Sequence, residues 1–245
     1  MLLQNKPFKN LINLTLILFC SIVLHSQNSE SDSIYDWFDS KIGKENLSLN
    51  NGKLLLNYDR VYENNDRFYF KNYVSGSVLY EGQIYNNITL NYDIFKDDLV
   101  IKPMGENDKM PIVLTKEKVQ SFTYEEKKYV NLSYSASKNP ELVNGFYEEG
   151  FVGDFVSFYV KHYKTKTEKI YNDKPYDDFT EKMSFVVFYK NEFYPISSKK
   201  SIVSLFPEYK KSITEFYSNN DYLIKTDKVR FFSNLFRFLT SISGT

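Results

Sequence analysis

The sequence predicts a mainly β protein with a helical C-terminal segment (α+β): an antiparallel meander, sandwich or partly closed barrel with two to three C-terminal helices packed on it. Three observations lead to this prediction. Apolar and polar residues alternate with a period close to two between Val78 and His162, short turn signals separate the runs, and the period becomes helical after Ser198. Strands that follow one another at intervals of about 8 to 12 residues favour antiparallel pairing over a parallel α/β sheet.

The composition is that of a chain able to bury a core. Its 245 residues are 42% hydrophobic, which argues against wholesale disorder, and 31 basic residues balance 31 acidic ones, which excludes a histone-like chain. One Cys excludes an internal disulfide, and two His are too few for most His-based metal sites. Lys outnumbers Arg 27 to 4, which we interpret as the codon bias of an AT-rich genome.

Residues 1–26 have the pattern of a signal peptide. Lys6 and Lys9 form a basic start, and a mostly apolar run of 14 residues, 11–24, precedes a polar stretch. A transmembrane helix needs about 20 apolar residues. The shorter run therefore predicts a signal peptide cleaved after Ser26, with an uncleaved anchor as the alternative.

Cys20 lies inside this apolar run. A lipoprotein signal is cut before a Cys that then carries lipid, but Phe19 is bulky for the position before such a cut and apolar residues continue past Cys20. We expect Cys20 to be discarded with the signal peptide, with lipidation as the alternative. The mature protein would then contain no Cys, and His162 would be its one His, which leaves little for Ser-His-Asp chemistry.

The remainder of the chain is expected to form a disordered linker, 27–33, and a single domain, 34–245. Within this domain, residues 34–195 form the antiparallel β body and residues 196–245 form the helical C-terminal segment. Turn signals punctuate the β body at 50–52, 81–82, 96–98 and 105–108.

The C-terminal segment predicts a strongly amphipathic helix. A first helix is expected to begin at Pro207 and to end at 219–220. Thr226 or Asp227 can cap the next one, which runs to about Ile242. On a helical wheel, one narrow polar stripe faces away from a broad apolar surface, and it consists of Arg230, Asn234, Arg237 and Ser241.

This last helix allows two interpretations. In the first, it docks on the open face of the sheet and buries its phenylalanines there. In the second, residues 227–242 make peripheral contact with a membrane or lie in the groove of a partner, because the helix combines aromatic residues with Arg.

Acidic residues provide the nearest approach to a catalytic or metal-binding group. Asp93, Asp97 and Asp98 lie close together but lack the spacing of a calcium loop, so we expect a solvated turn. Glu148–Glu149 and Asp177–Asp178 are expected to be exposed pairs of the same kind. A glycosidase would need two such carboxylates at a defined separation, and the sequence gives no sign of one.

His162 lies in an aromatic run, 155–163, and is expected to be a packed or surface residue of a strand. Gly145, Gly150 and Gly153 do not follow the order of a phosphate-binding loop. The sequence therefore predicts no catalytic, cofactor-binding or metal-binding residue, no cofactor and no enzymatic activity.

Tyrosine supplies 21 residues, many of them beside Lys in predicted strands. Exposed Tyr can stack on sugar rings, although half-buried strands also use Tyr to fill a core. Residues 27–195 carry 21 basic and 27 acidic side chains, a net charge of −6 that repels nucleic acid. Residues 196–245 carry eight basic and four acidic side chains, which favours docking on the acidic body or contact with an anionic surface.

Two segments together resemble a known group of proteins. Residues 76–85 (GSVLYEGQIY) run into 88–100 (ITLNYDIFKDDLV), and 201–211 (SIVSLFPEYKK) precede a helix end at 219–220. This combination resembles uncharacterised exported proteins of Bacteroidota over most of 50–240. The resemblance implies a β-rich protein of the cell envelope, and it carries over no activity and no functional residue.

We therefore expect an exported cell-envelope protein, located in the periplasm or associated with the outer membrane. It is expected to be non-enzymatic and to act through a binding surface in assembly or surface structure, with an outer-membrane or envelope protein as its partner. The alternative is a glycan-binding module that supports nutrient capture.

Overall fold

The structure is a computed structural model. It describes residues 41, 43, 47–62, 65–103, 110–135 and 137–244. The predicted signal peptide with Cys20, the linker 27–33 and the turn at 105–108 lie outside the described residues. The chain divides into two compact units, Met1–Ser48 and Leu49–Thr245, and all that follows concerns the second.

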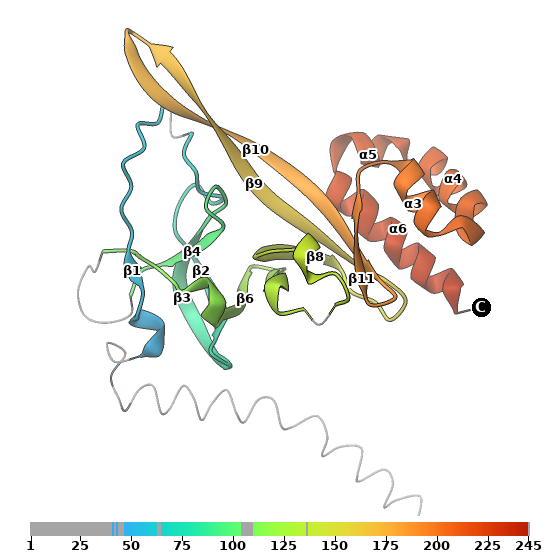
Figure 1. Ribbon diagram of the computed structural model, residues 1–245, viewed down its shortest axis with the longest axis horizontal. Helices are drawn as coiled ribbons and strands as arrows, with labels where there is room; N and C mark the ends of the chain where they lie inside the picture. The colour runs from blue at the N-terminus through green and yellow to red at the C-terminus, as the bar shows by residue number, and fades with distance from the viewer. Residues whose placement is uncertain are drawn as a thin grey trace, which may run out of the picture. The chain divides into compact units, whose positions relative to one another are not determined.

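The second unit is built on one antiparallel sheet, which has 11 strands among the described residues (Figure 1). The strands are β1 (Lys53–Leu54), β2 (Val74–Tyr80), β3 (Gln83–Asp93), β4 (Asp98–Ile101), β5 (Ile112–Val113), β6 (Val119–Tyr124), β7 (Lys127–Asn131), β8 (Phe146–Phe151), β9 (Ser157–Tyr171), β10 (Lys174–Tyr189) and β11 (Glu192–Ile196). Short 3₁₀ turns lie between some of them, at Ser48–Asn50, Lys116–Lys118, Leu132–Tyr134 and Pro140–Leu142.

The strand order shows two meanders that share β2. It runs β1-β5-β4-β3-β2-β6-β7-β8-β9-β10-β11, so the chain builds the sheet outward from β2 to β5, crosses back, and builds it outward again from β6 to β11. The sheet is open, and the predicted mainly β fold with C-terminal helices is confirmed in the form of a meander.

Tight hairpin turns join several of the strands. In the β2–β3 turn, Glu81 and Gly82 have φ values of 51° and 82°, and in the β9–β10 turn Asn172 and Asp173 have values of 49° and 59°. Two consecutive residues with positive φ form the turn whose twist suits a hairpin. The predicted turn at 81–82 is thereby confirmed.

Four α-helices follow the sheet in the described part of the chain: α3 (Lys199–Leu205), α4 (Lys210–Asn219), α5 (Asp221–Thr226) and α6 (Lys228–Ser243). The sequence predicts two to three, because α3 and α5 are too short, at 7 and 6 residues, to show a clear helical period. The helix ending at Asn219 is confirmed, and Asp227 is the cap of α6, where its Oδ1 accepts a hydrogen bond of 2.9 Å from the Arg230 amide.

Helix α6 packs its apolar side on β8 and β9, which confirms the first of the two interpretations of this helix. The Phe236 ring stacks on Phe158 with 5.4 Å between centroids, and the Phe232 ring lies 5.7 Å from the same residue. Both helix residues belong to one buried hydrophobic cluster, with Ile202 and Phe206 of the α3 region. None of the helices in the described ranges has the length and apolarity to cross a membrane.

Strands β9 and β10 form a hairpin that continues beyond its neighbours (Figure 1). β8 pairs with β9 no further than Val160, so the remainder of the hairpin, 161–184, is a two-stranded ribbon in the described sheet. A bare two-stranded ribbon has marginal stability in water. Here residues 57–62 and 65–70, which we call the strap, run along it, and Lys164 Nζ donates 2.7 Å hydrogen bonds to the carbonyls of Asp66 and Phe68.

Candidate functional site

Asp93 is not part of a solvated turn, as the sequence predicts, but is buried at the end of β3. Its Oδ2 lies 2.8 Å from Nε of Arg67, which is buried as well, and its Oδ1 accepts hydrogen bonds from the amides of Phe95 and Lys96. Burial raises the pKa of Asp93, and the backbone donors and Arg67 offset part of that rise. The expectation fails because Arg67 lies in the strap, far away in sequence, and its contact has no local signal.

Asp97 holds four segments together. Its Oδ1 accepts from the Tyr92 hydroxyl at 2.6 Å and from Lys161 Nζ at 2.7 Å, and Lys116 Nζ lies 3.3 Å from Oδ2. Asp98 also pairs with Lys116, at 3.7 Å. The acidic turn is therefore a structural junction in which the Asp97 and Asp98 carboxylates form ion pairs with lysine side chains of the protein itself.

Asp177 and Asp178 fasten the ribbon. Lys166 Nζ lies 2.9 Å from Asp177 Oδ1 and 3.1 Å from Oδ1 of Asp59 in the strap, and Lys169 Nζ lies 2.7 Å from Asp178 Oδ2. The two carboxylates are partly buried, so the predicted exposed pair is an ion-paired structural element.

Glu148 and His162 form a buried pair, whereas the sequence predicts that Glu148 is exposed. Glu148 is 5% exposed and His162 is 4% exposed, and His162 Nε2 lies 2.7 Å from Glu148 Oε2. Because a carboxylate can only accept, the imidazole Nε2–H donates. Lys127 Nζ approaches the same carboxylate at 3.2 Å from the solvent side.

The register of the sheet explains how these side chains meet. Glu148 lies opposite Tyr129 on one side and Val160 on the other, so Lys127 and His162, two residues further along their strands, flank it diagonally on the same face. Burial alone would raise the pKa of Glu148, but the hydrogen bond from His162 and the charge of Lys127 outweigh it, and the pKa lies below its ordinary value.

A cleft of about 600 Å³ opens where α6 leaves this face of the sheet, and we call it the α6 cleft. Glu148 and His162 lie at its base, and β10 contributes Glu181 and Met183. On the helix side, polar groups of the predicted stripe line it, namely Arg230, Asn234 and Arg237. Tyr69 of the strap completes the lining with its ring 4.7 Å from the His162 ring.

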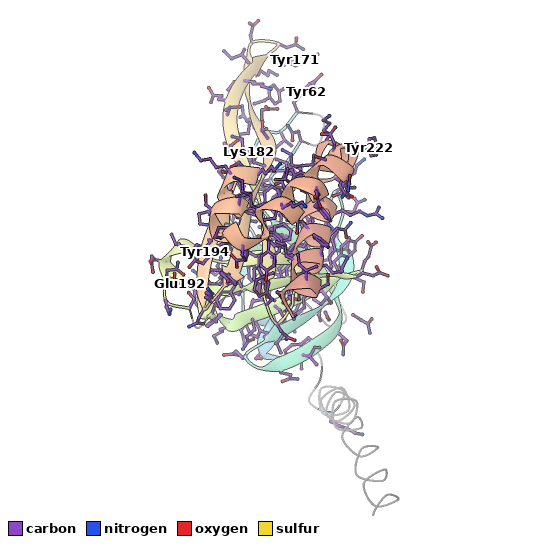
Figure 2. All side chains as sticks on the ribbon, turned by 90° about the vertical axis from the view of Figure 1, so that its right-hand side faces the viewer. Tyr62, Tyr171, Lys182, Glu192, Tyr194 and Tyr222 are labelled. Atoms are coloured by element: carbon purple, nitrogen blue, oxygen red, sulfur yellow. The ribbon has the colours of Figure 1, made fainter. Side chains whose placement is uncertain are left out.

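A second candidate surface lies at the end of the ribbon, where tyrosines from the strap and both strands gather. Figure 2 labels two of them, Tyr62 and Tyr171. The Tyr62 ring lies 4.5 Å from that of Tyr171 and 6.0 Å from that of Tyr176. Near them Tyr58 is 81% exposed and Ile170 is 77% exposed. We call these five residues the tyrosine end.

A small groove of about 220 Å³ adjoins the tyrosine end. Tyr58, Pro175 and Tyr176 supply its apolar surface, and its polar groups are those of Arg60, Glu168 and Asp177. The groove is smaller than the range of about 300–1,000 Å³ that is typical for drug-sized ligands.

No metal-binding arrangement is found among the described residues, where no three His, Cys, Asp or Glu side chains converge suitably. The comparisons with known proteins found no match: no family model, no curated protein and no solved structure is similar to this chain. The class of the protein is therefore defined by its fold and its two surfaces, as an open antiparallel sheet with a docked helical segment.

Sequence reasoning missed most of the α6 cleft, although a signal was present. Neighbouring residues of a strand point to opposite faces, so Glu148 and Glu149 cannot both face solvent when one face is covered. The chain's four arginines were a second signal: Arg67 makes the buried ion pair, and the other three line the cleft or the groove.

Proposed function

We propose that this chain is an exported cell-envelope protein of the periplasm or outer membrane, without catalytic activity, and that it acts by binding another envelope protein. The signal-peptide pattern of residues 1–26 and the resemblance to exported proteins of Bacteroidota support the location. The observation that carries the binding role is the tyrosine end.

Exposed aromatic clusters of this kind are unfavourable in water and enriched at protein interfaces. The tyrosine end lies at the far end of the ribbon from the helices, so it can approach a partner without steric hindrance from them (Figures 1 and 2). Asp59, Asp177 and Asp178 neutralise the charges of Lys166 and Lys169, so the aromatic rings supply much of the contact area at this end. We therefore expect the tyrosine end to make a largely apolar contact with a folded partner protein.

Site-specific photo-crosslinking in cells tests this function. A photoreactive residue replaces Ile170 or Tyr58 at the tyrosine end, and Tyr222 on α5, which is 79% exposed, serves as the matched control. We expect a discrete adduct with one envelope protein from positions 58 and 170 and none from position 222. Equal adducts from all three positions, or retention of the protein in the cytoplasm, would contradict the proposal.

The groove beside the tyrosine end favours glycan binding as the second candidate. Two tyrosines with neighbouring Arg, Glu and Asp side chains offer a stacking surface and hydrogen-bond partners for about one sugar ring. Affinity electrophoresis in polysaccharide gels tests it: Tyr58→Ala should abolish any retardation that the wild type shows, while Tyr134→Ala, at another exposed tyrosine, should leave it unchanged.

A further inference from the structure

The α6 cleft has the size of a small-molecule site and is open to solvent. Its volume of about 600 Å³ falls within the range of about 300–1,000 Å³ that such sites occupy. Its sides come from α6, between Val229 and Arg237, and from β10, and its base is the buried pair of Glu148 and His162. The sheet side is one face: Met183 lies opposite His162 in the β9–β10 register, and Glu181 is two residues further along.

The helix side presents two guanidinium groups. Arg230 and Arg237 are two helical turns apart, about 10.5 Å along the axis, and Asn234 lies between them. Arg237 Nη1 donates to Asn234 Oδ1 at 3.1 Å, and neither arginine has a carboxylate within ion-pair distance in the described part of the chain. Arg is rare in this chain, with 4 residues against 27 Lys, so two arginines at one cleft are more than the composition would lead one to expect. A guanidinium binds a carboxylate with two parallel hydrogen bonds, which an ammonium cannot do.

The β10 side and the base of the cleft present groups that can accept hydrogen bonds. Glu181 of β10 is exposed and forms no ion pair with any described residue. At the base, His162 Nδ1 is buried and has no hydrogen-bond partner among the described residues. Buried polar atoms are almost always paired. The unpaired ring nitrogen therefore makes the base of the cleft polar, although the atom itself is enclosed by its neighbours.

We propose that the α6 cleft binds a small carboxylate that also carries a hydrogen-bond donor, the simplest such molecule being an α-amino acid. The carboxylate lies between Arg230 and Arg237, the ammonium or hydroxyl group donates to Glu181, and the apolar part contacts Tyr69 and Met183. This site is separate from the tyrosine end and does not depend on the proposed function.

The experiment uses the purified protein and pooled L-amino acids, measured by saturation-transfer NMR and then by calorimetry. Each amino acid is compared with its amide, which lacks the carboxylate, and with its N-acetyl derivative, which lacks the ammonium group. We expect at least one amino acid to bind with Kd below about 1 mM, and its amide to bind about 10-fold or more weakly.

Matched variants assign the binding to the cleft. Arg230→Gln should weaken binding about 10-fold, while Lys228→Gln, which removes the same charge from the same helix outside the cleft lining, should leave it unchanged. Glu181→Gln should weaken binding of the amino acid more than that of its N-acetyl derivative. Thermal melting confirms that each variant folds.

Three results would overturn the proposal. The first is the absence of binding by every amino acid at about 10 mM, well above the expected Kd. The second is equal binding of acids and amides, and the third is an equal loss in Arg230→Gln and Lys228→Gln.

Discussion

Gly145 is a residue at which a single added methyl group would displace the carboxylate of Asp97. Its φ of +74° disfavours a side chain, and a Cβ there would lie 1.6 Å from Asp97 Oδ2, the carboxylate that joins Tyr92, Lys116 and Lys161. Gly82 has a similar φ of +82° with no atom within 4 Å. A substitution at Gly82 therefore tests the backbone strain alone, and the same substitution at Gly145 tests the strain together with the steric contact.

Gly145→Ala should destabilise the protein more than Gly82→Ala does. The backbone strain costs about 1–2 kcal/mol at each position, and displacement of Asp97 should add at least about 1 kcal/mol at position 145. Urea denaturation of both variants measures the difference. An equal decrease in the free energy of unfolding in the two variants would show that Asp97 can move without an energetic cost.

Glu148→Gln should destabilise the protein by about 1–3 kcal/mol at neutral pH, because it removes the charged acceptor of His162 and Lys127. The folded pKa of Glu148 lies below the ordinary value of 4.5. Its stabilising effect is therefore fully present above that value and is lost as the pH falls through the folded pKa. The difference from wild type should shrink on acidification.

Denaturation at several pH values between about 7 and 3 measures this effect. Glu149→Gln is the matched control, because its carboxylate pairs with the exposed Lys128 and should contribute less than about 1 kcal/mol. A difference between wild type and Glu148→Gln that stays constant with pH would contradict the role of the Glu148 charge.

At the residue scale, sequence reasoning succeeded where the signal is local and failed where it is not. The cap Asp227 and the turn at 81–82 depend on neighbours within a few residues, and both were predicted. Glu148 was expected to be exposed because its partner His162 comes from the next strand, and only the register brings the two together.

Among the elements, the ribbon depends most on contacts outside its own strands. Its single ladder leaves both strands without a third strand alongside in the described sheet, and the strap compensates through Lys164 and through the Asp177 amide, which donates to the Arg60 carbonyl at 2.7 Å. Phe179, buried on the ribbon, packs 5.3 Å from Phe95. The strap has no periodic pattern, so its position could not be predicted.

Lys164→Met should release the strap while keeping the aliphatic stem of the side chain. Because two charge-assisted hydrogen bonds to Asp66 and Phe68 are lost, we expect amide exchange at Asp177 to become about 10-fold or more faster. Val187, in the part of β10 that pairs with β11, should exchange at the wild-type rate. Hydrogen exchange followed by mass spectrometry or NMR measures both, and unchanged exchange at Asp177 would show that Lys164 does not hold the strap.

At the scale of the whole molecule, the acidic body and the basic C-terminal segment meet through apolar packing, and Arg230 and Arg237 of the segment line the cleft. The sequence predicted this division, a net −6 against +4, and docking on the body was one of its two interpretations. The cleft itself could not be predicted, because it combines residues from the strap, the sheet and α6.

Deletion of residues 226–245 should abolish cooperative folding of the sheet. It removes Phe232 and Phe236, which are buried against β9, and Phe231, which is buried against α4, and the loss of even one buried Phe costs about 3–5 kcal/mol. Circular dichroism during thermal unfolding measures the outcome. A truncated chain that stays soluble and melts cooperatively would instead favour a separate role for α6.

The composition of the α6 cleft also sets an order of events during synthesis. A growing chain emerges at about 5–20 residues per second, and the strap with Tyr69 appears long before Arg237 does. A nascent chain that still lacks α6 therefore has no cleft, and, like the truncated chain above, it is not expected to fold its sheet cooperatively. Any molecule bound in the cleft would be recognised by finished chains and ignored by partly made ones.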